Sequence, residues 1–300
     1  MTTKRLLFAL CCLSVVTSPV FGQTIRVLVT NDDGIGAPGI AAMVDELQLN
    51  PNLIVDIVAP ATNQSGTADA FTTSSFGVAA GTTATGDIGT AVSGKPADAV
   101  MWALFSGMVP APDIVVSGIN AGQNIGRFVA EDLSGTVGAA SVAARRGFPA
   151  IAVSLALGGS DYSPPAKYVA NVVEDFRTKP RLGKKLTSKT GLDQRLLLNV
   201  NFPVCASGSI KGVAVVPLTE SQDLIGRVVT GYMTTGPNTY QPVFSSTNAF
   251  AIDCTTPLEK PTSDIEAFTN GFVSVTPMNP TLAPDSKVKK FKFLAKIPFN

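Results

Sequence analysis

The most constraining feature of this sequence is a regular alternation between short β-branched runs and longer segments with helical periodicity. The apolar runs have the composition of strands buried on both faces, and the segments between them carry apolar residues at helical spacing. Such alternation predicts an α/β fold in which helices cover both faces of a mostly parallel sheet. The expected strands are 24–30, 53–59, 113–117 and 150–156, and the expected helices begin at Pro38 and span 96–107, 136–147 and 163–179.

The chain after residue 180 has a different texture. Segments "RLLLNVNFP" and "IKGVAVVPL" predict further strands, residues 217–262 are polar and turn-rich, and 263–278 pairs a short helix with a strand. Earlier in the chain, residues 66–95 predict a β-rich excursion or a long loop. We therefore expect one domain over residues 23–300, in which 184–300 complete the sheet and add an arm-like, β-rich extension.

The first 22 residues have the layout of a secretory signal peptide. Two basic residues precede the apolar run 6–16, and small or turn-forming residues follow up to Gly22. The run is too short to span a membrane, and the alternative is a buried N-terminal helix. A lipoprotein anchor at Cys11 fits poorly because Leu10 precedes it. We expect residues 1–22 to be cleaved and the protein to be exported, to a periplasm or to the medium.

The charge balance of the cleaved chain narrows its partners. Cleavage removes Lys4 and Arg5, which lowers the 23 basic residues to 21 against 22 acidic ones, a net charge of −1. No basic run or basic, aromatic-rich face is present, so a nucleic-acid polymer is not an expected partner. No long apolar stretch follows residue 22, so no membrane anchor is expected.

The chain contains no histidine. This excludes a Ser-His-Asp triad, a phosphohistidine intermediate and a zinc site with imidazole ligands. After cleavage Cys205 and Cys254 are the remaining thiols, too few for a thiolate metal site, and an oxidising compartment predicts a disulfide between them. Any metal must then have oxygen ligands, which favours one hard divalent cation, Mg²⁺ or Mn²⁺.

Polar residues gather in four segments that are expected at one edge of the sheet. In a doubly wound sheet, ligands bind beyond the carboxyl ends of the strands. Two adjacent carboxylates there repel each other and resist burial, and a divalent cation would neutralise both. The four segments contain Asn31, Asp32 and Asp33; Asn63, Gln64 and Ser65; Asn120 and Asn124; and Ser134, Gly135 and Thr136.

Each segment also has a plainer interpretation. Asp-Asp-Gly is a common turn sequence, and "NQSG" is typical of an ordinary loop. "SGINAGQNIG" does not meet the G-x-G-x-x-G fingerprint, which argues against dinucleotide binding. "SGTVGAA" could be a capped helix with small packing residues, although its hydroxyls and free N–H groups also suit an anion. The position of Asp32 and Asp33 directly after a buried strand favours the cation site.

Taken in order, these segments and several others resemble the SurE family, the survival-protein E nucleotidases or acid phosphatases. The resemblance is carried by "NDDGIGAPGI" (31–40), "IVAPATNQSG" (57–66), "GKPADAV" (94–100), "PDIVVSGINAGQNIG" (112–126), "SGTVGAA" (134–140), "PAIAVSL" (149–155), "LLNVNFP" (197–203) and "SDIEAFTNGFVSVTPM" (263–278). It implies a Rossmann-like fold and a metal-dependent phosphomonoesterase that acts on nucleoside monophosphates. It also implies metal ligation by Asp32, Asp33, Ser65 and Asn120, and a homo-oligomer formed through the C-terminal extension.

The sequence departs from the family pattern at two positions. Members often carry a larger aromatic or histidine residue where Gly36 stands, which puts the base preference in doubt. Lys95 stands where threonine is frequent, and it brings either a cation near the site or an ordinary surface lysine. The apparent signal peptide is also unusual, because members are mostly cytoplasmic in bacteria.

The resulting hypothesis is hydrolysis by in-line attack on a metal-bound phosphoryl group. Asn124 and the 134–136 segment (Ser134, Gly135, Thr136) would hold the phosphate oxygens, and one of the catalytic aspartates, Asp32 or Asp33, is the candidate general acid. Two alternatives stay open. One is a phosphatase for other small esters or short polyphosphate, and the other is a non-catalytic exported protein that binds phosphate or nucleotides.

Overall fold

A nine-stranded sheet forms the centre of the part of the chain that the computed structural model describes, residues 24–178, 196–220, 229–244, 251–280 and 287–298. Its strand order is β3-β4-β2-β1-β5-β6-β7-β11-β8. The strands are β1 (Ile25–Thr30), β2 (Leu53–Pro60), β3 (Val78–Thr82), β4 (Ile88–Val92), β5 (Ile114–Ala121), β6 (Ala150–Leu155), β7 (Leu197–Phe202), β8 (Val213–Val215) and β11 (Val273–Met278).

The run from β4 to β7 is parallel, whereas β3 pairs antiparallel with β4 and β11 pairs antiparallel with β7. The predicted α/β fold with a mostly parallel sheet is confirmed. From β1 the chain first builds one side of the sheet through β2 and then the other side through β5. The strand order therefore reverses between β1 and β5, which is where open α/β sheets form a ligand crevice.

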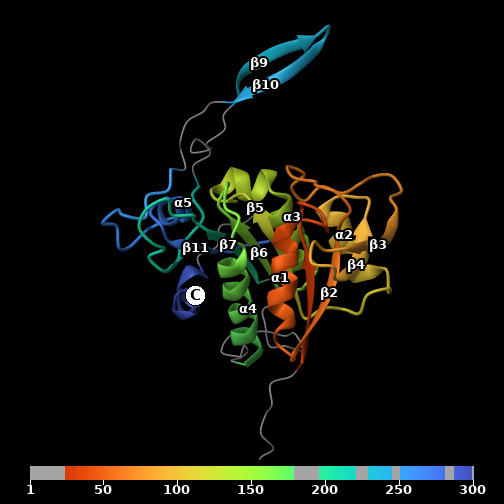
Figure 1. Cartoon of the computed structure of the whole chain (residues 1–300), viewed down its shortest axis with the longest axis horizontal. Coiled ribbons are helices and arrows are strands. Elements are labelled where there is room, and N and C mark those ends of the chain that lie inside the picture. The colour runs from red at the N-terminus through yellow and green to blue at the C-terminus, as the bar shows by residue number, and fades with distance from the viewer. Residues whose placement is uncertain (1–23, 179–195, 221–228, 245–250, 281–286, 299–300) are drawn as a thin grey trace, which may run out of the picture.

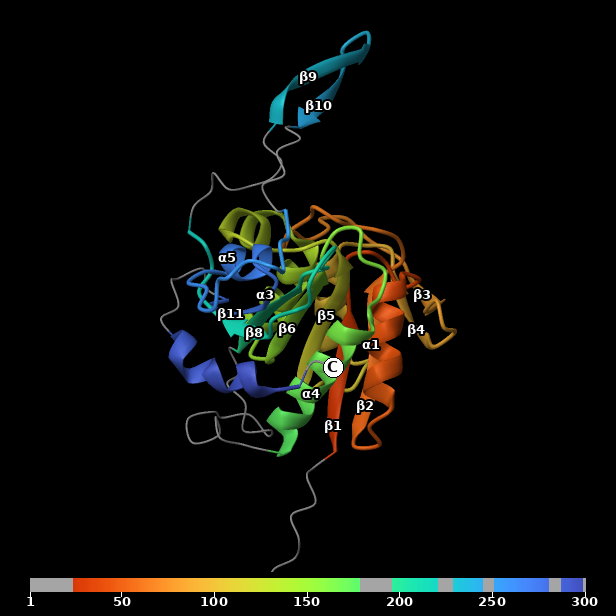
Figure 2. The same cartoon turned by 60° about the vertical axis from the view of Figure 1, so that its left-hand side comes forward.

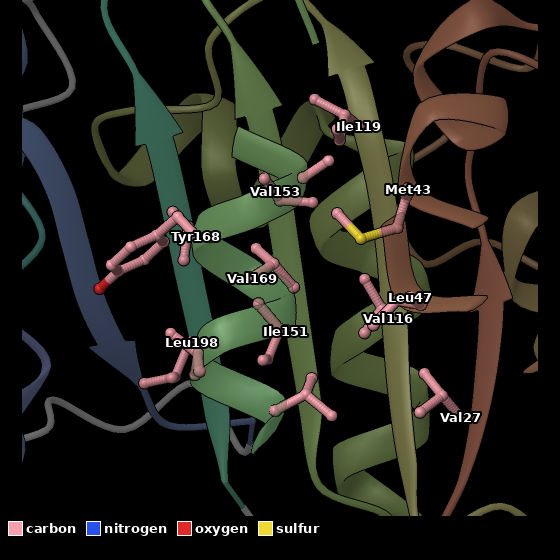
Figure 3. Close-up of a cluster of buried hydrophobic side chains, with 14 of the residues drawn as sticks. Val27, Met43, Leu47, Val116, Ile119, Ile151, Val153, Tyr168, Val169 and Leu198 are labelled. Atoms are coloured by element: carbon pink, nitrogen blue, oxygen red, sulfur yellow. The ribbon is translucent and has the colours of Figure 1, made fainter. Parts of the chain in front are cut away.

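Helices cover both faces of this sheet (Figures 1 and 2). One face carries α1 (Pro38–Gln48) and α4 (Ser163–Thr178), and the other carries α2 (Pro96–Phe105) and α3 (Gly135–Arg145). Figure 3 shows the first core, in which the helical side chains Met43, Leu47, Tyr168 and Val169 lie over the strand side chains Val27, Val116, Ile151, Val153 and Leu198. On the other face α3 buries mostly small residues, glycines and alanines, which lets its axis lie close to the sheet.

Two local features differ from the sequence-based expectation. The strand predicted to end at residue 117 continues to Ala121, with a register shift between Ser117 and Asn120. Asn120 therefore lies in β5 itself and not in the loop after it. A short π-helix, η1 (Phe128–Leu133), follows and runs directly into α3. Neither feature has a clear periodic signal, because small and polar residues dominate this stretch.

The C-terminal part completes the sheet through β7, β8 and β11, with α5 (Asp264–Thr269) before β11. A 3₁₀ helix, η3 (Lys287–Lys296), adds Phe291 and Leu294 to the α1/α4 core. Strands β9 (Val229–Gly236) and β10 (Thr239–Phe244) form a separate antiparallel hairpin that stands away from the main sheet in both views (Figures 1 and 2).

The structure contains the predicted disulfide between Cys205 and Cys254, whose Cα atoms are 5.7 Å apart. It joins the chain just after β7 to the segment that leads into α5. The predicted signal peptide, residues 1–22, lies outside the described residues. Across the described residues, every helix is too short or too polar to cross a membrane.

Candidate active site

The candidate site lies at the carboxyl ends of β1 and β5, where the strand order reverses. The chain leaves β1 through a tight turn in which the Asn31 side chain exchanges two hydrogen bonds with the Gly34 backbone. Gly34 has a φ of +101°, and a Cβ there would lie 3.0 Å from the carbonyl carbon of Thr62. This turn presents Asp32 and Asp33, the two residues between Asn31 and Gly34, to the loop that follows β2.

Asp32 is a buried carboxylate with 2% exposure. Thr136 Oγ1 donates a hydrogen bond of 2.6 Å to its Oδ1. Burial raises the pKa of Asp32 to about 6; the hydrogen bond from Thr136 opposes this rise, and the charge of Asp33 adds to it. Gly135 is needed at the start of α3, because a Cβ there would lie 2.8 Å from the Asp32 Cβ and 3.0 Å from its Oδ2. The N-terminus of α3 therefore rests directly on this carboxylate.

Asp33 is partly exposed and joins two other predicted segments. Its Oδ1 accepts a hydrogen bond of 3.2 Å from the Asn63 side chain, and its Oδ2 accepts one of 3.0 Å from the Ala121 backbone N–H. The carboxylate thus ties the loop after β2 to the end of β5. Both segments were predicted to meet at this edge, and the structure brings them together.

The loop after β2 places Ser65 at the site. Asn63 Oδ1 accepts a hydrogen bond of 2.9 Å from the Ser65 N–H, and the Gln64 N–H donates one of 2.7 Å to the Asp32 carbonyl. The same loop then passes against α3, where a Cβ at Gly138 would lie 2.1 Å from the Ala68 carbonyl oxygen. Ser65 is an exposed residue of this loop.

Asn120 lies near the carboxyl end of β5. Its Nδ2 donates a hydrogen bond of 2.7 Å to the Gly122 carbonyl, so the nitrogen end of the amide is fixed. Among the described residues, no hydrogen bond reaches its Oδ1. The carbonyl end of the amide is therefore the part of Asn120 that can act as a ligand.

The Asn124 side chain is buried and points toward β6. Its Nδ2 donates a hydrogen bond of 2.9 Å to Ser154 Oγ, and its backbone N–H donates one of 2.6 Å to Asn201 Oδ1. Its carbonyl accepts a hydrogen bond of 2.7 Å from Asn199 Nδ2. A phosphate oxygen needs a donor, and one of the two amide N–H groups of Asn124 is engaged by Ser154. Phosphate binding by Asn124 stays a prediction, while its observed contacts anchor the loop.

The segment Ser134–Gly135–Thr136 opens α3 as predicted. Ser134 is the N-cap, and its Oγ accepts a hydrogen bond of 3.0 Å from the Val137 N–H. Both hydroxyls are buried and engaged, Ser134 with its own helix and Thr136 with Asp32. The first N–H groups of the helix and the positive end of its dipole make this the anion-favouring side of the site.

The donor set fits a hard divalent cation. It consists of the carboxylates of Asp32 and Asp33, the Asn120 amide oxygen and the Ser65 hydroxyl, all oxygen donors of the kind that Mg²⁺ and Mn²⁺ take. Across the described residues, no three His, Cys, Asp or Glu side chains form a metal-binding cluster, so any cation at this site relies partly on neutral oxygens. A buried carboxylate beside a second one is the arrangement that such a cation relieves.

The two departures from the family pattern differ in their surroundings. A Cβ at Gly36 would find no atom within 4 Å, so the position opens to solvent beside the site. Lys95 is the N-cap of α2, and its Nζ donates a hydrogen bond of 3.2 Å to the Phe71 carbonyl. This bond to a backbone carbonyl favours the interpretation of Lys95 as an ordinary surface lysine.

Three polar residues near the site were not singled out from the sequence. Asn199 and Asn201 share one face of β7, and the pattern N-V-N in an otherwise apolar strand was the signal that could have found them. The third is Tyr162. Its ring lies against α1, since a Cβ at Gly39 would be 3.2 Å from Tyr162 Cε1. Burial raises the pKa of its phenol, and the charge of Asp33 adds to the rise.

The chain is similar to several known proteins. The sequence model of the family described as "Survival protein SurE" matches residues 27–223. The "5'-nucleotidase SurE" of Desulfitobacterium hafniense is 34% identical over 277 residues, which cover 89% of this chain and 96% of that protein. The "5'/3'-nucleotidase SurE" of Yersinia enterocolitica is 40% identical over 192 residues, which cover 64% of this chain and 69% of that protein. The crystal structure of the SurE protein from Aquifex aeolicus is similar with a TM-score of 0.64 and 27% identity, and covers 90% of this chain and 99% of that chain.

Proposed function

Because the chain belongs to the SurE family, we propose that it is a phosphoric monoester hydrolase that converts nucleoside monophosphates to nucleoside and phosphate with one divalent cation, Mg²⁺ or Mn²⁺. The family match supports the nucleotidase class. The main observation in favour of a cation is the burial of Asp32 beside Asp33. The hydrogen-bond partners described for the two carboxylates are neutral hydroxyl, amide and backbone N–H groups.

Asp32, Asp33, Ser65 and Asn120 would hold the cation. A divalent cation in such a site neutralises phosphate charge and lowers the pKa of a bound water. Thr136 orients the Asp32 carboxylate through Oδ1, and the Ala121 N–H orients Asp33. The α3 N-terminus would stabilise the charge that develops on the phosphate oxygens, because its N–H groups and dipole already point to this edge.

A substrate panel in the presence and absence of EDTA tests this function. We expect 5'- or 3'-nucleoside monophosphates to be hydrolysed faster than sugar phosphates and short polyphosphate. EDTA should abolish the activity, and added Mn²⁺ or Mg²⁺ should restore it. Equal rates with and without EDTA would contradict the cation. A preference for polyphosphate or sugar phosphates would favour the broader phosphatase, and tight nucleotide binding without turnover would favour a binding protein.

We also propose that the protein is exported and assembles through its C-terminal extension. The signal-like residues 1–22 and the disulfide support an oxidising compartment. Isolated two-stranded hairpins are marginally stable in water, and β9–β10 exposes Tyr232, Met233 and Tyr240, which supports a second copy as the surface that covers it. Protein isolated from the periplasm or the culture medium should begin near Gln23 and scatter light as an oligomer. Its absence from both fractions would contradict export, an N-terminal Met1 on the exported protein would contradict cleavage, and a monomer would contradict assembly.

A further inference from the structure

Asp264 is a fully buried acidic residue that the proposed chemistry does not use. Burying a carboxylate is costly unless hydrogen bonds or an opposite charge compensate it. Among the residues that the structure describes, no Lys or Arg side chain pairs with Asp264; three hydrogen-bond donors converge on it instead. Its Oδ2 accepts a bond of 2.7 Å from the Gly126 N–H, and its Oδ1 accepts bonds of 2.8 and 2.6 Å from the N–H and Oγ1 of Thr219.

These donors come from segments far apart in the sequence. Gly126 belongs to residues 122–127, here called the β5–η1 loop, and lies 138 residues before Asp264. Thr219 precedes the β9–β10 hairpin. Two backbone bonds close the arrangement, because the Arg127 N–H donates to the Thr219 carbonyl and the Asp264 N–H donates to the Pro217 carbonyl. One carboxylate thus fastens the β5–η1 loop to the C-terminal part of the chain.

The β5–η1 loop connects two groups of the candidate site. At its start the Gly122 carbonyl holds the Asn120 amide, and beyond its end η1 leads into Ser134 and α3. In the middle of the loop, the backbone of Asn124 is hydrogen-bonded to the Asn199 and Asn201 side chains of β7. Gly126, the residue that Asp264 holds, lies between these anchors and η1. The bond from Gly126 to Asp264 and the bonds from Asn124 to β7 therefore together fix the short run of backbone that begins at Asn120.

We propose that Asp264 is a positioning residue of the site: its carboxylate fixes the β5–η1 loop and thereby places the Asn120 amide oxygen for the cation. The part concerning the cation rests on the proposed function, whereas the part concerning the loop does not. Partners that orient metal ligands typically change metal affinity about 10- to 100-fold when they are removed.

The test compares Asp264→Asn with Glu266→Gln. In Asp264→Asn the amide oxygen can still accept from Thr219, but its NH₂ group then faces the Gly126 N–H, so the loop loses its acceptor. Glu266 is the matched control, since it also lies on α5 and accepts bonds of 2.6 and 2.7 Å from a threonine, Thr262, without touching the loop. The readouts are Mn²⁺ affinity by calorimetry and amide hydrogen exchange of the loop in EDTA.

We expect Asp264→Asn to weaken Mn²⁺ binding by about 10-fold or more and to speed amide exchange in residues 122–127, and Glu266→Gln to change neither. Wild-type affinity and wild-type loop exchange in Asp264→Asn would overturn the proposal. If that variant does not fold, Thr219→Val decides: it removes one donor to Asp264, and it should speed loop exchange relative to Thr219→Ser, which keeps the hydroxyl. If the wild-type chain binds no Mn²⁺, the proposed function fails, and loop exchange alone decides the role of Asp264.

Discussion

Asp32→Asn and Asp33→Asn should each lower nucleotidase activity by at least about 100-fold, because each removes one of the two carboxylate charges that the described residues give the proposed cation site. The remaining ligands, Ser65 and Asn120, are neutral, so little charge is left to attract the ion. Initial rates with a nucleoside monophosphate at saturating Mn²⁺ measure the effect. Asp45→Asn, an exposed aspartate on α1 that accepts a hydrogen bond from Thr85, is the control and should keep wild-type activity.

The same variants should show that the loss is not due to unfolding. The pKa of Asp32 in the folded chain is about 6, above its ordinary value of 3.8. Between these values the folded state binds more protons than the unfolded state, so the free energy of unfolding falls as pH rises through this window, by up to about 3 kcal/mol. Asparagine cannot titrate, and its Oδ1 can still accept the hydrogen bond from Thr136. In EDTA above pH 6, Asp32→Asn should therefore be more stable than the wild-type chain.

Thermal unfolding with and without Mn²⁺ completes this prediction. The cation should raise the Tm of the wild-type chain and barely change that of either variant, because a ligand stabilises the state that binds it. A pair of solvated turn aspartates would behave in the opposite way. Near-normal activity in both variants, with the same Mn²⁺ effect on Tm as in the wild-type chain, would remove the cation site from the proposal.

Breaking the Cys205–Cys254 disulfide should destabilise the chain by about 4 kcal/mol, because the bond closes a long loop of the unfolded state. The two cysteines are 49 residues apart, and the intervening segment includes β8 and the β9–β10 hairpin. Denaturant unfolding of residues 23–300, oxidised against fully reduced, measures the effect without changing a side chain. The double variant with Cys205→Ala and Cys254→Ala should match the reduced wild-type chain.

A thiol titration checks the premise of this second prediction. The denatured, unreduced chain from residue 23 should show no free thiol. Two free thiols per chain would contradict the disulfide, and equal unfolding midpoints before and after reduction would contradict its contribution to stability. The loss should appear in the unfolding midpoint and leave Mn²⁺ binding intact at temperatures where the chain is folded.

The alternating sheet and helices were predictable because their periodicity is strong, whereas the details of the site depend on contacts that no local pattern records. Asp32, Ser65, Asn120 and Thr136 could be placed at one edge from the rule that parallel strands end together. The orientation of Asn124 could not, since its side chain bonds to Ser154 and its backbone to β7, both of which are remote in the sequence. The same holds for β5, where glycine and asparagine extend a strand whose apolar run has ended.

Asp264 illustrates the limit most clearly. After Ser263 it has the appearance of an acidic residue in the first turn of a capped helix, a common and usually exposed position. Its burial results from the β5–η1 loop and the segment around Thr219 closing over it. A local sequence pattern identifies a helix start there, but it does not show which distant segments will cover the carboxylate.

Residues from the C-terminal half of the chain hold the β5–η1 loop, and this affects the order in which the site can form during synthesis. The groups proposed to bind the cation and phosphate all lie between Asp32 and Thr136, so a ribosome has made them before the chain is half complete. The residues that hold the β5–η1 loop, Asn199, Asn201 and Asp264, are made later. Domains that emerge N-terminus first can fold only as far as their contacts have been synthesised. A nascent chain therefore carries every proposed ligand long before it can order them, so the site is translated early and assembled late.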